Sequence, residues 1–217
     1  IFAICSLFLL SASPQKSIDL DGDGKPDQIM FEGKPDDNVF TIIVNDVRYE
    51  GKGNYICGMY EIADIDSTDG VREIAIPERG PSDDYATAFL LYNQDKIREI
   101  GKIPGAGNMM CWDGSGIIHT MVRGSILHTW FFPAAFVLDK KHTLHMAEQQ
   151  LYPMNIPKIG FTGFSRGANC TAKRNFPLQA SPADSTIIRT MTPGEKFTIV
   201  ASDNKRWCVV QTSVGTW

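Results

Sequence analysis

The residues best suited to chemistry in this chain lie in Asp19–Asp27 (DLDGDGKPD). Asp19, Asp21 and Asp23 alternate with single residues, and Asp27 follows four positions later. Carboxylates held this close repel one another, and their charges resist leaving water. A hard cation with about six to eight oxygen ligands removes that conflict, and glycines let the backbone turn tightly around it. We therefore expect calcium in this stretch, the first loop. The expected ligands are Asp19, Asp21, Asp23 and Asp27, with the carbonyl oxygen of Lys25.

The first loop matches an EF-hand loop only in its first half. An EF-hand has a bidentate glutamate where this chain has Met30. The residues Gln28–Phe31 favour a β-strand rather than a helix. The sequence therefore predicts a calcium loop that leads into a strand.

The same pattern returns twice, at intervals of about 45 residues. The second loop, Asp64–Glu73, has one inserted residue and precedes the apolar run Ile74–Ile76. The third loop, Cys111–Ile118, keeps the Gly-x-Gly turn but has lost most acidic positions. Such a period is typical of β-propeller blades and similar arrays. The alternative for the second and third copies is an ordinary turn rich in aspartate and glycine.

On these motifs, residues 17–125 resemble the FG-GAP and VCBS-type repeats of secreted and surface proteins. The resemblance implies a propeller-like or compact antiparallel β repeat region with calcium as its cofactor. It also implies further calcium ligands in the second loop at Asp64, Asp66, Asp69 and Glu73. Three copies are too few to close an ordinary propeller of about four or more blades.

The first 13 residues indicate export. Ile1–Leu10 is apolar and uncharged, and small residues follow it, as in a secretory signal peptide. The segment is too short to span a bilayer, and a buried first strand is the alternative. The chain has no initial Met or basic residues, so we expect a clipped N-terminus. A bacterial protein that is secreted or lies at the cell surface, with no transmembrane span after leader removal, is the resulting expectation.

Four cysteines follow the leader, and an even number in an exported protein permits two disulfides. The simplest pairing joins Cys57 to Cys111 and Cys170 to Cys208, and free buried thiols are the alternative. No pair has the CxxC spacing of a redox motif or a zinc ribbon.

The charge balance changes near residue 170. Residues 14–169 carry 15 basic and 22 acidic side chains, whereas residues 170–217 carry six basic and three acidic ones. The glycine-rich stretch Gly160–Gly167 lies at the same place. We therefore predict a repeat domain at 14–157, a linker at 158–169 and a second domain at 170–217.

Short β-branched runs separated by Pro-Gly and Asp-Asn turns predict a small meander barrel at 170–217. The order resembles bacterial SH3 (SH3b) domains, with Phe176 in the first strand, Pro193-Gly194 at a turn, Trp207 in a later strand and Gly215–Trp217 at the close. The resemblance implies contact with cell-wall peptidoglycan or a peptide, for which Trp207 and Trp217 are candidate residues, and a clipped C-terminus. With residues 61–151, this tail resembles exported proteins of Gram-positive bacteria.

The remaining patterns complete a mostly β prediction. Ala88–Ile103 predicts a hairpin with its turn at Asn93–Lys96, and two strands are expected around Pro133, at His128–Phe132 and Ala135–Leu138. Leu144–Leu151 is the best candidate for a short helix.

Two catalytic patterns are weak. Gly163–Gly167 spells GxSxG around Ser165, but all four histidines precede this serine, so the base of an α/β-hydrolase is missing. His142 and His145 would share one face of a helix with Glu148 as a zinc pair, but HxxH alone is common, and surface histidines are the better interpretation.

The loop Glu78–Tyr85 offers Asp83, Asp84 and Tyr85 as a further candidate ligand site, with a solvated turn as the alternative. Basic residues are too few to indicate nucleic acid. The sequence favours an exported, non-catalytic binding protein with structural calcium. The alternatives are a cell-wall hydrolase that the SH3-like domain targets, and a surface receptor or inhibitor of a partner protein.

Overall fold

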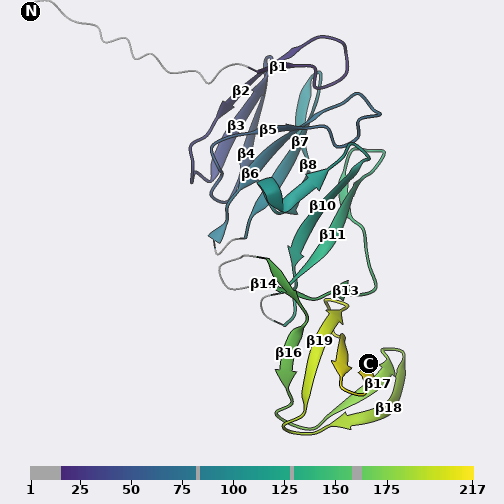
Figure 1. The fold of residues 1–217 in the computed structure, drawn as a ribbon. Coiled ribbons are helices and arrows are strands. Elements are labelled where there is room, and N and C mark those ends of the chain that lie inside the picture. The colour runs from purple at the N-terminus through teal and green to yellow at the C-terminus, as the bar shows by residue number, and fades with distance from the viewer. Residues whose placement is uncertain (1–15, 82–83, 128–129, 158–162) are drawn as a thin grey trace, which may run out of the picture. The chain divides into compact units, whose positions relative to one another are not determined.

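The computed structural model describes residues 16–81, 84–127, 130–157 and 163–217, so the predicted leader lies outside it. The described chain is mostly β and antiparallel, which confirms the predicted fold class (Figure 1). It also contains the 3-10 turn η2 (Gly107–Met109). None of the helices within the described ranges is long and apolar enough to cross a membrane.

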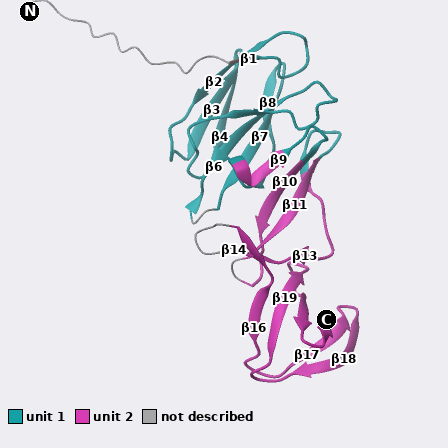
Figure 2. Cartoon of the chain, in the orientation of Figure 1, with its two compact units in different colours: residues 1–107, 112–117, 138–144 teal, residues 108–111, 118–137, 145–217 magenta. Residues whose placement is uncertain are grey.

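The chain divides into two units, and each includes more than one segment (Figure 2). Unit 1 takes in residues 1–107, 112–117 and 138–144, and unit 2 takes in residues 108–111, 118–137 and 145–217. These limits differ from the predicted domains at 14–157 and 170–217. The described part of the predicted linker contains the strand β15 (Phe164–Arg166) and the start of β16 (Ala168–Thr171).

Unit 1 contains two four-stranded sheets, each an antiparallel meander in chain order. The first consists of β1 (Lys16–Ile18), β2 (Asp27–Glu32), β3 (Val39–Val44) and β4 (Val47–Lys52). The second consists of β5 (Glu61–Ala63), β6 (Glu73–Glu78), β7 (Ala86–Asn93) and β8 (Lys96–Pro104). Strands β7 and β8 form the predicted hairpin, in which Asn93 pairs with Lys96.

The two sheets of unit 1 share one apolar core. Ile29, Phe40 and Ile42 from the first sheet lie in the same cluster as Ile74 and Leu90 from the second. Because β2 alternates buried and exposed residues, only one face of the first sheet enters this core. Burial of β-branched side chains between the sheets fixes the loops at the ends of their strands.

A third meander continues the pattern. It consists of β9 (Met110–Trp112), β10 (Ile117–Arg123), β11 (Phe131–Leu138) and β12 (Leu144–Met146). The second strands of the three sheets begin at Asp27, Glu73 and Ile117, close to the predicted spacing. Strand β11 also pairs with β14 (Asn155–Pro157), which pairs with β15.

Two predictions in this region were wrong. His128 and Thr129 of the first strand expected before Pro133 lie outside the described residues. From Phe131 to Leu138 the chain is one strand, β11, rather than two, because the fixed φ of proline fits an extended chain and Pro133 is exposed. The residues Leu144–Leu151 form no helix: β12 takes the first three, and the rest has no regular structure. Pairing with β11 overrides the local helical preference.

The C-terminal part of unit 2 is a small antiparallel assembly, as the predicted barrel requires. Strand β19 (Lys196–Ser202) pairs with β13 (Tyr152–Pro153), β16 and β20 (Cys208–Thr212), and β20 pairs with β21 (Gly215–Thr216). Strands β17 (Phe176–Ser181) and β18 (Asp184–Met191) form a hairpin. Leu178, Met191 and Val210 are the buried centre, against which Phe197 and Trp217 pack.

The predicted disulfides are not formed. The cysteines at positions 57, 111, 170 and 208 are free thiols. For the second pair the register gives the reason. Cys170 lies opposite Phe197 on one side of β19, and Cys208 lies opposite Ser202 on the other. Strand β19 therefore separates these two cysteines.

Candidate functional site

The first loop joins β1 to β2 and brings three of its carboxylates together. Oxygens of Asp19, Asp21 and Asp27 lie within 4.8 Å of one another, and within the described ranges no other group of three carboxylate, thiol or imidazole ligands is this close. Asp27 is buried, with 6% of its surface exposed. Such a group of oxygens suits a hard cation.

Backbone N–H groups orient these carboxylates. Gly22 donates to Asp19 Oδ1 at 2.8 Å, and Gly24 donates to Asp19 Oδ2 at 3.0 Å. Leu20 N donates to Asp27 Oδ2 at 2.8 Å. Gly22 and Gly24 have φ of +74° and +83°, which glycine adopts without strain. The two glycines therefore allow the loop to fold back around its own carboxylates.

Asp23, also predicted as a ligand, does not join this group of carboxylates. The carboxylate of Asp23 lies 3.2 Å from Lys25 Nζ, and its Oδ1 accepts the Lys25 N–H at 2.8 Å. The hydrogen bond from this backbone N–H lowers the pKa of Asp23. Three of the four aspartates predicted in the first loop are thus gathered.

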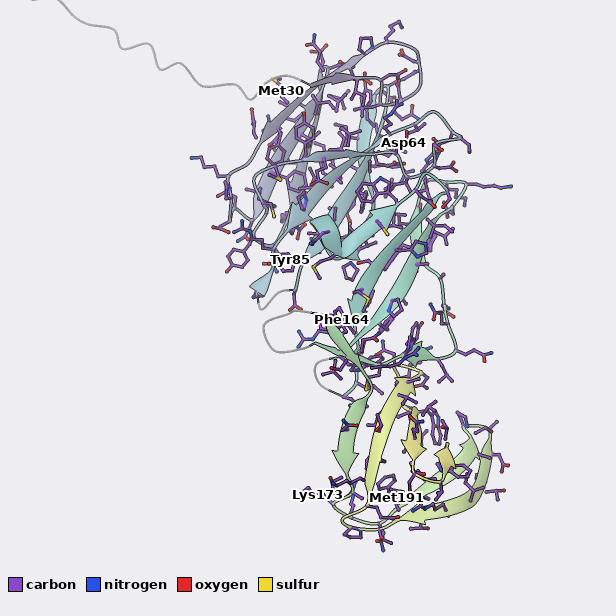
Figure 3. All side chains as sticks on the ribbon, viewed as in Figure 1. Met30, Asp64, Tyr85, Phe164, Lys173 and Met191 are labelled. Atoms are coloured by element: carbon purple, nitrogen blue, oxygen red, sulfur yellow. The ribbon has the colours of Figure 1, made fainter. Side chains whose placement is uncertain are left out.

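The second loop joins β5 to β6, and its acidic residues are arranged differently. Asp64, labelled in Figure 3, follows β5, and Glu73 begins β6 with none of its surface exposed. Glu73 Oε2 accepts the Ile65 N–H at 3.2 Å. Burial, with smaller contributions from the nearby Asp69 and Asp64, raises the pKa of Glu73 to about 7. The second loop therefore concentrates negative charge around a buried carboxyl group.

The three loops share one backbone turn. Gly24, Gly70 and Gly114 have φ of +83°, +75° and +83°, each after an aspartate. The aspartate Oδ1 accepts the N–H of the residue two positions later at 2.8, 2.8 and 3.1 Å. The second and third loops are therefore structural copies of the first. The third ends in Ile117 where the others have Asp27 and Glu73, so it has lost the carboxylate.

Consecutive loops also make the same backbone contact. Arg72 N donates to Leu20 O at 2.9 Å, and Gly116 N donates to Ile65 O at 2.7 Å. Leu20 and Ile65 are both second residues of their loops, and neither has exposed surface. Each loop is thus fixed against the next.

Residues from two hairpin turns support the first loop, and the motif did not identify them. Asn45, between β3 and β4, donates through Nδ2 to Asp27 Oδ1 at 2.8 Å and to Tyr92 Oη at 3.2 Å. Gln94 N, between β7 and β8, donates to Asp21 Oδ2 at 3.2 Å. Asn45 has φ of +52°, as residues in tight hairpin turns often do. In the sequence, only the turn-forming pair Asn45-Asp46 could have indicated this position.

Trp207 and Trp217, predicted as ligand residues, line one groove in unit 2. The groove has a volume of about 640 Å³, and its walls come from β17 and from residues 206–210. Leu178 and Val210 lie among its lining residues and are 5% and 7% exposed. The guanidinium of Arg206 lies 5.6 Å from the centroid of the Trp207 ring. The groove therefore combines an apolar floor, two indole rings and a cation.

The other predicted ligand residues lie in unit 1, on the connection between β6 and β7. Asp83 lies outside the described residues. Asp84 is exposed, and Tyr85, labelled in Figure 3, is half-buried, with its carbonyl accepting the Gly105 N–H at 2.8 Å.

Neither catalytic pattern has the required geometry. Ser165 lies in the exposed strand β15, and β16 follows two residues later, so the helix of a nucleophile elbow is missing. His142 lies in a turn with φ of +50°, and His145 lies in β12. The two histidines therefore do not share a helical face.

The chain matches no protein-family model, and no match was found among curated proteins or solved structures.

Proposed function

We propose that this chain is an exported, non-catalytic binding protein of the cell surface. Its C-terminal strands bind a peptide, of peptidoglycan or of similar extended form, and calcium stabilises its repeat region. The observation that carries this proposal is the groove lined by Trp207 and Trp217.

The chemistry of the groove suits an extended peptide with a carboxylate. Indole rings provide large, rigid contact surfaces and lose little conformational entropy on binding. Arg206 adds a cation beside Trp207 that attracts an anionic group on the ligand. Leu178 and Val210 provide an apolar floor, which favours a peptide side chain over a bare sugar.

Calcium has a structural role in this proposal. The close oxygens of Asp19, Asp21 and Asp27 repel one another without a cation, and a bound ion offsets that repulsion. Extracellular calcium sites have a Kd of about 10⁻⁴–10⁻³ M, so such a loop is filled outside the cell. Binding to the folded state alone then raises the free energy of unfolding.

The groove is tested with purified cell walls. The full chain is incubated with peptidoglycan in millimolar calcium, and the bound fraction is measured against protein concentration. We expect saturable binding, with affinity about tenfold or more weaker for Trp207→Ala, because a central indole contact is removed. Ile187→Ala is the matched control: Ile187 is 59% exposed and lies outside the groove.

Two results would contradict the proposal. One is an equal bound fraction for Trp207→Ala and the parent chain. The other is release of soluble wall fragments, which would identify a hydrolase.

A further inference from the structure

The turn between β19 and β20 carries two residues that line the groove in unit 2, Arg206 and Trp207. Side chains at the start of the turn hold its backbone. Ser202, which has no exposed surface, accepts the Asn204 N–H at 3.0 Å and donates through Oγ to Trp207 O at 2.8 Å. Asp203 Oδ1 accepts the N–H groups of Arg206 and Trp207, each at 2.8 Å. These hydrogen bonds fix where the Arg206 and Trp207 side chains leave the backbone.

Asn204 connects this turn to another part of unit 2. Its Oδ1 accepts the Ser125 N–H at 2.6 Å, and its Nδ2 lies 3.4 Å from Ser125 Oγ. Ser125 lies in the connection between β10 and β11, 79 residues earlier in the chain. Asn204 itself has φ of +58° and does not line the groove. Any effect of Asn204 on the groove therefore passes through the turn.

The connection between β10 and β11 is a firm support for this contact. Gly124 N donates to Trp130 O at 2.9 Å, and Trp130 Nε1 donates to Ile126 O. Trp130 has no exposed surface, and its ring lies so close to Gly124 that a Cβ atom there would overlap it. Ser125 lies between the two residues that contact Trp130. It therefore offers Asn204 a fixed partner.

We propose that Asn204 is a positioning residue for the groove: through Ser125 it holds Arg206 and Trp207 in the arrangement that receives the ligand. This role rests on the proposed function, the binding of an extended peptide with an anionic group. Side chains that are ordered before binding lose less conformational entropy when the ligand binds. The groove then depends on a connection that lies well before the predicted second domain at 170–217.

The test compares Asn204→Gly with the parent chain in the cell-wall assay. Glycine keeps the turn, because it adopts positive φ without strain, but it has no side chain to contact Ser125. We expect the affinity for peptidoglycan to fall about two- to tenfold, the cost of ordering one more side chain on binding. Ser125→Ala is the matched control. It keeps the N–H that donates to Asn204 and loses only the 3.4 Å contact, so it should bind like the parent chain.

Arg206→Ala separates a positioning role from a general loss of stability. Because Asn204 acts through Arg206 and Trp207, the loss of affinity caused by Asn204→Gly should be smaller in an Arg206→Ala background. Equal losses in the two backgrounds would overturn the proposal. Affinity of Asn204→Gly equal to that of the parent chain would also overturn it.

Hydrogen exchange of the ligand-free chain separates this role from the proposed function. The amides of Arg206 and Trp207 should exchange faster in Asn204→Gly, because the turn opens more often. Unchanged exchange would overturn the positioning role even if the parent chain binds cell walls. No wall binding by the parent chain would contradict the proposed function, and the exchange rates would still decide whether Asn204 holds the turn.

Discussion

Asp27 and Glu73 occupy the same position in successive loops but have different surroundings. Both are buried, and both accept the N–H of the second residue of their loop. The remaining oxygen of Asp27 accepts a hydrogen bond from Asn45, whereas that of Glu73 has no partner. Burial is the largest of the causes that raise the pKa of Glu73 to about 7.

The raised pKa predicts that stability depends on pH when metal is absent. The folded state holds the Glu73 proton more tightly than the unfolded state does. Its contribution is therefore complete below pH 4.5 and is lost as the pH rises through about 7. Over this window we expect a loss on the order of 3 kcal/mol in the free energy of unfolding. The measurement is urea denaturation from pH 4.5 to pH 8 in chelator.

Glu73→Gln is the matched variant, because the amide keeps the acceptor for Ile65 N but does not titrate. Its stability should vary less over the same range and exceed that of the parent chain at pH 8. Parallel pH profiles for the two chains would show that Glu73 does not titrate in this window.

At the scale of elements, Arg72 links two of the repeat loops. Its N–H donates to Leu20 O at 2.9 Å, its guanidinium Nη1 donates to Asp19 O at 3.0 Å, and Nε lies 3.5 Å from the Asp64 carboxylate. Arg72 thus holds the first residue of both loops. The position of one candidate calcium ligand therefore depends on the neighbouring repeat.

Removing this side chain should weaken both the fold and the first loop. For Arg72→Ala we expect a loss of about 1–2 kcal/mol in the free energy of unfolding, because Asp19 O loses a charged donor. Calcium affinity should also fall, since Asp19 is less firmly placed. Chemical denaturation and calcium titration measure the two effects.

Arg79→Ala is the control for this change. Its guanidinium makes an exposed contact with Asp36 at 4.0 Å, which is expected to contribute less than about 1 kcal/mol. If the two variants have the same free energy of unfolding, the contacts of Arg72 with the two loops do not stabilise the fold.

The elements that follow from local pattern were predictable from the sequence. The Asp-Gly turns, their spacing and the hairpin at β7 and β8 each have a signal within a few residues. The contacts of Asn45 with Asp27 and of His142 with Asp69 were not predictable, because residues 18 and 73 positions apart meet only after the strands pair. The failed helix at Leu144–Leu151 has the same cause, since β11 decides its conformation.

At the scale of the whole molecule, the two candidate functions lie in different units. The first loop belongs to unit 1 and the Trp207 groove to unit 2. The acidic balance lies in residues 14–169 and the basic balance in residues 170–217. This charge distribution favours our proposal of cation binding by the acidic repeats and recognition of an anionic ligand by the basic C-terminal strands.

This separation predicts that loss of calcium spares the groove. Asp21→Asn should bind cell walls like the parent chain at a temperature where both are folded, because Asp21 does not line the groove. The bound fraction in the wall assay is the measurement. A tenfold weaker binding by Asp21→Asn, with folding confirmed by circular dichroism, would mean that the two sites are coupled.

The most direct test of calcium binding in the first loop is calorimetric titration of the full chain with CaCl₂. We predict one saturable site with a Kd of about 10⁻⁴–10⁻³ M. In Asp21→Asn this affinity should fall about tenfold or more, because the variant keeps its acceptor oxygen but loses the charge. Asp95→Asn, with the same charge change on the exposed turn between β7 and β8, should bind like the parent chain. No saturable heat, or equal affinity in parent and Asp21→Asn, would contradict a calcium site at Asp19, Asp21 and Asp27.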